Sequence, residues 1–207
     1  MKVAKGALYK VPFRRRREGL TNYRQRRKLI LSRKPLLVVR KTNKHIIAQL
    51  IKPSLRGDLV LASATSMEIA RDYGWRGSTK NTPMAYLVGY LLGLKALRQG
   101  LEEAVLYIGL HRPTKGARVF AVLKGVLDAG LKIPHGEEVM PSEDRIKGRH
   151  IENYAKLLER DPQMYNTRFS EYLRKGLRPE QMSKHFEECL ERIKEKFLGE
   201  LKRAPPA

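Results

Sequence analysis

The chain has 207 residues, of which 42% are hydrophobic, and a formal net charge of +22 at pH 7. This length suits one domain with extensions or two small domains, and the hydrophobic content excludes a wholly disordered protein. The single cysteine, Cys189, excludes an internal disulfide and fits a reducing compartment.

The charge is concentrated in the first sixty residues, which hold 18 lysines and arginines but only two acids, Glu18 and Asp58. Such a segment repels itself in water unless a polyanion neutralises it, and nucleic acid is the polyanion that fits best. Residues 22–33 are expected to form a short helix capped by Thr21, with basic side chains on every side. We expect the arm, residues 1–35, to be loose alone and ordered on its partner.

The arm is rich in arginine, whose planar guanidinium suits phosphate and can also stack on bases. Aromatic and amide side chains are interleaved with these cations, which favours RNA over a solvated charge run or a localisation signal. The RNA-binding candidates of the arm are Phe13, Arg14, Arg15, Arg16, Arg17, Thr21, Asn22, Tyr23, Arg24, Arg26, Arg27, Lys28, Arg33 and Lys34.

The sequence shows no pattern typical of membrane insertion or secretion. No stretch reaches the roughly 18 apolar residues needed to span a bilayer, and the N-terminus has no apolar h-region. We therefore expect a cytoplasmic protein with no membrane contact.

Residues 36–66 have the pattern of a three-stranded antiparallel meander. Two apolar runs flank a turn at Thr42-Asn43, which predicts a hairpin. Gly57-Asp58 then leads into a third strand over 59–66.

The basic loop 73–82 follows. Its Trp75 is expected either to stack on a base or, as a lone Trp more often does, to lie in the core. Better RNA-binding candidates in this loop are Arg76, Lys80 and Asn81.

A helix is predicted from Thr82, as N-cap, to about Gln99, with Gly100 at the C′ position. Gly89 and Gly93, four residues apart, allow a close approach to a sheet or helix. A buried strand over 104–108, a loop over 109–118 and a helix over 119–129 follow. Strand, loop and helix together predict a two-layer α/β core.

The loop 109–118 contains cationic side chains and two glycines between a strand and a helix. It lacks the spacing of a Walker loop, so three interpretations stay open: a nucleotide site, an ordinary loop, or an RNA phosphate contact. Its RNA-binding candidates are His111, Arg112, Thr114, Lys115 and Arg118.

The C-terminal part is predicted to be helical after a long loop. Residues 132–150 form that loop, 151–160 a short helix, and 179–202 a longer one. An apolar stripe on the long helix must lie on the core or on another molecule; it consists of Met182, Phe186, Cys189, Leu190, Ile193, Phe197 and Leu201. We expect Cys189 to be a small core side chain.

These patterns predict an α/β fold of the two-layer α+β kind. Its mixed sheet would begin with the antiparallel meander and carry helices packed on it. Three parts are expected: a basic RNA-binding arm over 1–35, an α/β core over 36–136, and a loop with a helical extension over 137–207.

Catalytic constellations do not stand out. The five histidines are scattered, and the few acids of the core region, Asp58, Glu68, Asp72 and Asp128, suggest no metal site. We expect no catalytic residues, metal or cofactor. Two alternatives remain: an enzyme acting on RNA, which would need these acids to converge on a basic cleft, and a DNA-binding protein.

Three segments resemble a known family: FRRRREGLTNYRQRRKLI, TPMAYLVGYLLGLKAL and GLHRPTKGARVFAVLKGVLDAGLKIPHG. The chain resembles the archaeal-type 5S-rRNA-binding large-subunit ribosomal proteins, the universal large-subunit protein eighteen family, homologous with eukaryotic large-subunit protein five. The resemblance runs over roughly Leu8–Gly136.

The resemblance implies a structural, non-catalytic constituent of the large subunit. Its partners would be 5S rRNA, 23S rRNA and the neighbouring proteins of the central protuberance, with no small-molecule substrate. The RNA contacts that it implies lie at Arg14–Arg17 and Thr21–Lys28, and with weaker correspondence at Arg112–Arg118.

Overall fold

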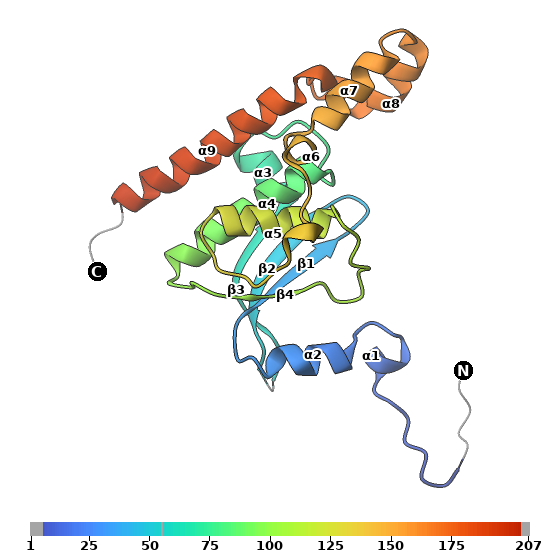
Figure 1. Ribbon diagram of the computed structural model, residues 1–207, viewed down its shortest axis with the longest axis vertical. Coiled ribbons are helices and arrows are strands. Elements are labelled where there is room, and N and C mark those ends of the chain that lie inside the picture. Colours follow the sequence, from blue (N-terminus) through green and yellow to red (C-terminus); the bar gives the residue numbers. More distant parts are fainter. Residues whose placement is uncertain (1–5, 55, 204–207) are drawn as a thin grey trace.

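The computed structural model describes residues 6–54 and 56–203, with side chains as far as Phe197. A four-stranded sheet lies at the centre, with helices on both of its faces (Figure 1). The strands are β1 (Leu36–Lys41), β2 (Ile46–Lys52), β3 (Leu59–Thr65) and β4 (Val105–Tyr107). The helices are α1 (Arg14–Arg17), α2 (Tyr23–Ile30), α3 (Ser66–Asp72), α4 (Thr82–Arg98), α5 (Arg118–Asp128), α6 (Glu143–Lys147), α7 (Arg149–Leu158), α8 (Pro162–Arg174) and α9 (Met182–Arg203), with 3-10 turns η1 (Glu137–Val139) and η2 (Pro179–Gln181).

The strand order is β3-β2-β1-β4, and the first three strands form the predicted antiparallel meander. The hairpin turn lies where expected, because the Thr42 backbone N–H donates to the His45 carbonyl and the His45 N–H donates back to Thr42 Oγ1, both at 2.8 Å. Strand β4 adds to β1 in parallel, after a crossover that contains α4. The predicted fold class, a mixed sheet with helices packed on it, is confirmed.

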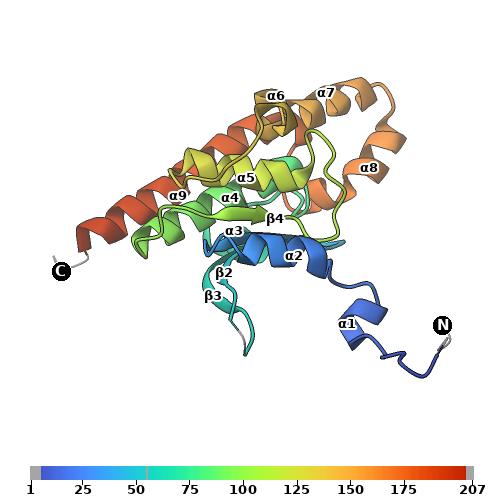
Figure 2. The same cartoon turned by 60° about the horizontal axis from the view of Figure 1, so that its bottom comes forward.

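The two faces of the sheet have different partners. Alternate side chains such as Leu37, Val39 and Leu50 are buried in the main core with α4 and α5. The opposite face carries a small apolar cluster that includes Leu36 and Tyr107, and α2 lies against it (Figure 2). The sheet therefore separates the main core from the N-terminal arm.

Helix α4 is buried on nearly all sides, because it lies between the sheet, α5 and α9. The predicted close approach at its glycines is confirmed: a Cβ on Gly89 would lie 2.0 Å from the Val122 carbonyl oxygen of α5. Gly100 closes the helix with φ +72°, as predicted. In the part of the chain that the structure describes, no helix is both long and apolar enough to cross a membrane.

The N-cap predicted for this helix was wrong by one residue. Asn81, whose backbone is extended, accepts a hydrogen bond from the Met84 N–H at 2.9 Å, so it caps α4 and Thr82 is already helical. An asparagine carboxamide reaches the amide three residues on as well as a threonine hydroxyl does. Sequence alone did not distinguish these two adjacent capping residues.

The apolar stripe of α9 lies on the core of this chain. Met182, Phe186, Cys189, Ile193 and Phe197 are buried in the same cluster as α4, while the Leu201 side chain lies outside the described ones.

Trp75 is also buried: its ring lies 5.0 Å from that of His185 and its Nε1 donates to the Ser78 carbonyl at 3.2 Å. The interpretation of Trp75 as a core residue is confirmed, and no face of it is free for a base.

The long loop predicted over 132–150 was partly wrong, because it contains α6 and the turn η1. Helix α8 had no counterpart in the prediction. Its sequence signal is the pair Asp161-Pro162: the Asp161 carboxylate accepts from the Met164 N–H at 3.1 Å and the proline occupies the first helical position.

The thiol of Cys189 is expected to be unreactive in the folded protein. The residue is fully buried, and burial raises the pKa of the thiol to about 11, so the reactive thiolate is scarce below pH 10. At pH 8, a disulfide exchange reagent should label the native protein far more slowly than the urea-unfolded protein. Equal labelling rates would show that α9 does not stay on the core.

Candidate nucleic-acid interface

The first part of the interface is α1, which lies well clear of the sheet (Figure 1). Its four side chains, Arg14, Arg15, Arg16 and Arg17, are all exposed, and Phe13 before them is 89% exposed. The Arg14 guanidinium pairs with Glu18 at 3.3 Å, and Arg15 Nε donates to Thr21 Oγ1 at 3.1 Å. Exposed contacts of this kind are weak, so these guanidinium groups are available to a phosphate.

Helix α2 continues the cationic surface. The predicted cap, Thr21, was wrong, because Asn22 accepts the Gln25 N–H at 3.1 Å. The helix also ends earlier than predicted, at Ile30, and the chain then turns through Arg33, which has φ +56°. A groove along this part of the arm is lined by Arg16, Thr21, Asn22, Tyr23, Arg24, Arg27, Lys28 and Leu31.

The expectation that α2 is basic on every side was wrong. Leu29 packs against Leu36 and Tyr107 on the sheet. Arg26 forms an ion pair with Asp58 beside β3, and the hydrogen bond to that carboxylate raises the pKa of Arg26. Because both contacts are on one side, α2 docks on the sheet with one face and presents the other cations outward.

A hollow between the arm and the sheet brings distant candidates together. Arg15, Thr21, Tyr23 and Arg26 of the arm line it with His111 of the loop 109–118. Two further cations that sequence reasoning missed, Arg40 and Arg56, also line it. The signal for Arg40 was its position on β1, where it alternates with buried residues and so points to the arm's side of the sheet.

Two glycines of the loop 109–118 adopt the left-handed backbone conformation, Gly109 with φ +62° and Gly116 with φ +69°. Arg112, Thr114 and Lys115 are exposed between them, and Lys115 pairs with Glu138 at 3.0 Å. Burial, followed by repulsion from Lys41 and Arg118, lowers the pKa of His111. The loop therefore presents cations to solvent on the edge of the arm's hollow.

The candidates of the loop 73–82 separate into two places. Lys80 and Asn81 lie in one cleft with Arg118, whose Nη1 donates to the Lys80 carbonyl at 2.7 Å. Arg76 lies elsewhere, in a hollow beside α9, where its backbone N–H donates to His185 Nε2 at 3.0 Å. The structure thus joins Lys80, Asn81 and Arg118 but not Arg76.

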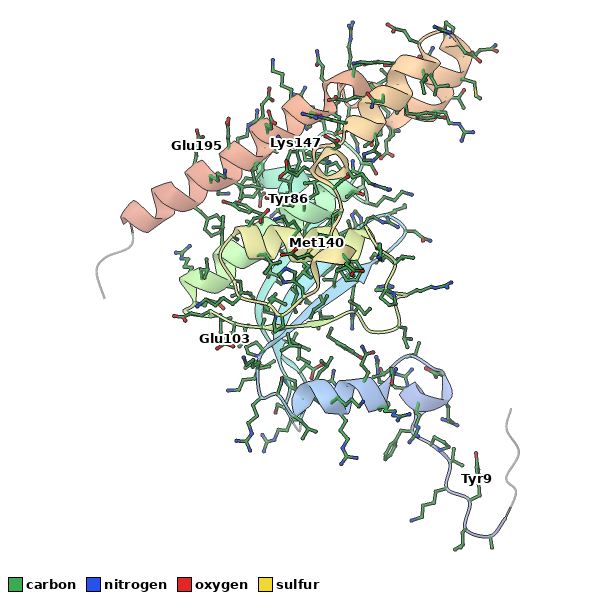
Figure 3. All side chains as sticks on the ribbon, viewed as in Figure 1. Tyr9, Tyr86, Glu103, Met140, Lys147 and Glu195 are labelled. Atoms are coloured by element: carbon green, nitrogen blue, oxygen red, sulfur yellow. The ribbon has the colours of Figure 1, made fainter. Side chains whose placement is uncertain are left out.

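The last two candidates of the arm lie where it joins the sheet. Arg33 and Lys34 are both exposed, and Lys34 pairs with Glu103, which Figure 3 labels just before β4. Glu103 is itself at the surface, so a phosphate can compete with it for Lys34.

The four acids that an RNA-processing enzyme would need do not share one basic cleft, since Asp58 lines the hollow beside the arm and Glu68 lines a separate one. Each has a cationic partner of its own: Arg26 for Asp58, Lys95 for Glu68, Arg71 for Asp72, and Lys124 for Asp128. Among the side chains that the structure describes, which end at Phe197, no three His, Cys, Asp or Glu are grouped so as to hold a metal ion.

Two comparisons with known proteins each find similar proteins. The model of a family described as ribosomal large subunit proteins 60S L5 and 50S L18 matches residues 7–103 and 95–136. The large ribosomal subunit protein uL18 of Caldivirga maquilingensis is 53% identical over 196 residues, which cover 94% of this chain and 95% of that protein.

Proposed function

The chain belongs to the family of ribosomal large-subunit proteins 60S L5 and 50S L18, and from this we propose that it binds 5S rRNA and links it to 23S rRNA in the central protuberance. It is a structural constituent of the large ribosomal subunit. Its neighbours there are expected to be rRNA and other large-subunit proteins, and its role is expected to be non-catalytic.

The observation that supports RNA binding most strongly is the exposed cationic surface of α1 and α2. Within the described part of the chain, the side chains of Arg16, Arg17, Arg27 and Lys28 have no acidic partner. Cations left unpaired on a protein with a net charge of +22 favour a polyanion. Phe13 and Tyr23 stand among them as exposed rings on which unpaired bases can stack.

The choice of 5S rRNA is tested by competition at ~0.15 M salt, where non-specific binding is weakened. The intact protein, with labelled 5S rRNA bound, is challenged with unlabelled 5S rRNA, an unrelated folded RNA of equal length, and duplex DNA. We expect 5S rRNA to compete at least about a hundredfold better than either rival. Equal competition by the unrelated RNA would refute 5S specificity, and equal competition by DNA would support the DNA-binding alternative.

A further inference from the structure

A basic cleft lies where the C-terminal helices meet the core. Five cationic side chains, Lys41, Lys80, Arg118, Arg145 and Arg168, line it together with His150. They come from β1, the loop before α4, α5, α6, α7 and α8. Three of these six residues, Arg145, His150 and Arg168, belong to the C-terminal extension, in which the sequence analysis named no RNA-binding candidate.

The acids that line this cleft do little to neutralise it. Among the residues that the structure describes, Glu171 is the one acidic side chain that lines the cleft, and Lys175 pairs with it at 3.2 Å. Arg118 donates to a carbonyl rather than to a carboxylate. Among the side chains that the structure describes, Arg145 and Arg168 have no ion pair or hydrogen bond. So many like charges in one place are unfavourable unless an anion occupies the cleft.

The cleft adjoins the hollow beside the arm. His111 lines that hollow, and it is close enough to Lys41 and Arg118 of the cleft for both to lower its pKa, after the larger effect of burial. On the other side, repulsion by Arg145 adds to burial in lowering the pKa of His150. The cationic side chains thus continue from the arm past His111 into the cleft.

We propose that this cleft binds the phosphate backbone of ribosomal RNA, so that α6, α7 and α8 extend the RNA-binding surface of the arm. The inference rests on the proposed function for the kind of RNA. Cations on five separate elements suit a ligand with a charge at every unit better than they suit a small anion. Continuity with the arm's surface favours RNA over an acidic protein segment.

The first test removes two exposed cations, Arg145→Ala with Arg168→Ala. Binding of 5S rRNA and of protein-free 23S rRNA is measured separately over a series of salt concentrations. With at least one RNA, we expect about tenfold weaker binding and a log–log salt slope shallower by about 1.5, since each lost phosphate contact lowers the slope by roughly 0.7–0.9. The matched control, Lys156→Ala with Arg160→Ala, removes the same charge from exposed positions on or just after α7 that do not line the cleft.

A second measurement does not depend on the stability of those variants. Glu171→Cys places a thiol in the cleft for a photo-activated cross-linker, Lys156→Cys serves as its control, and buried Cys189 stays unlabelled. Cross-linking to either RNA well above the control supports the proposal. Cross-linking no stronger than the control, or a cleft variant that binds both RNAs like the wild type, would overturn it. Loss of 5S specificity alone would refute the proposed function and leave the cleft's RNA contact standing.

Discussion

Replacing Arg14, Arg15, Arg16 and Arg17 together by alanine is expected to weaken 5S rRNA binding by about 10²–10³-fold at ~0.15 M salt. If each guanidinium neutralises one phosphate, the log–log salt slope should become shallower by about 3 to 3.5. The melting temperature should change by no more than a degree or two, because α1 is exposed throughout and contributes no buried residue. Binding titrations over a range of salt and a thermal unfolding scan measure the two effects separately.

A control of equal charge shows whether position matters. Alanine at Lys156, Arg160, Arg174 and Arg178 removes four exposed cations from the region of α7 and α8. These residues line neither the arm's grooves nor the basic cleft, so we expect a loss of affinity of no more than a few-fold. If the two variants lose equal affinity, RNA is attracted by net charge alone and the arm is not a binding site.

Local patterns predicted those parts of the fold that depend on neighbours in sequence. The turn at Thr42, the close approach at Gly89 and the C′ glycine Gly100 each follow from residue chemistry within a few positions. Adjacent capping residues compete on nearly equal terms, which is why Asn81 was missed beside Thr82. Helix α8 was missed because Phe169 is its one buried residue, so its sequence shows no long apolar stripe.

The interface itself depended on contacts that no local pattern shows. Helix α2 looked basic on every side because one leucine, Leu29, gives little amphipathic signal, yet the sheet offers Leu36 and Tyr107 to pack on it. The cleft joins Lys41 to Arg168, which are far apart in sequence, so only the packing of α8 against the core brings them together. Tertiary packing, rather than any motif, decides which cations share a surface.

The arm combines a docked helix with an exposed one. The ion pair of Arg26 with Asp58 and one small apolar cluster hold α2 to the sheet, whereas the contacts that the structure describes for α1 are all exposed. The sequence-based expectation that the arm orders on its partner stays a prediction. If it holds, the docked face of α2 limits how much of the arm must be ordered when RNA binds, which lowers the entropic cost of binding.

The largest effect on stability is expected where α4 crosses α5. A Cβ on Gly89 would lie 2.0 Å from the Val122 carbonyl oxygen, and one on Gly125 would lie 2.2 Å from the Tyr86 carbonyl oxygen. Backbone atoms cannot move aside as a flexible side chain does, so even one methyl group must push the helices apart. We expect Gly89→Ala to lower the free energy of unfolding by about 3 kcal/mol or more, and the melting temperature by roughly 6–12 °C.

Helix propensity alone predicts the opposite sign, since alanine in a helix interior is favoured over glycine by about 1 kcal/mol. Gly136→Ala is the matched control, because Gly136 has an ordinary φ of −93° and a Cβ there would meet no atom within 4 Å. That variant should be as stable as the wild type or more stable by up to about 1 kcal/mol. Denaturant unfolding of both variants decides the matter: a Gly89→Ala protein as stable as the Gly136→Ala protein would mean that α4 and α5 do not pack at backbone contact. The basic cleft would then lose its support, because Lys80 just before α4 and Arg118 at the start of α5 are held together by that packing.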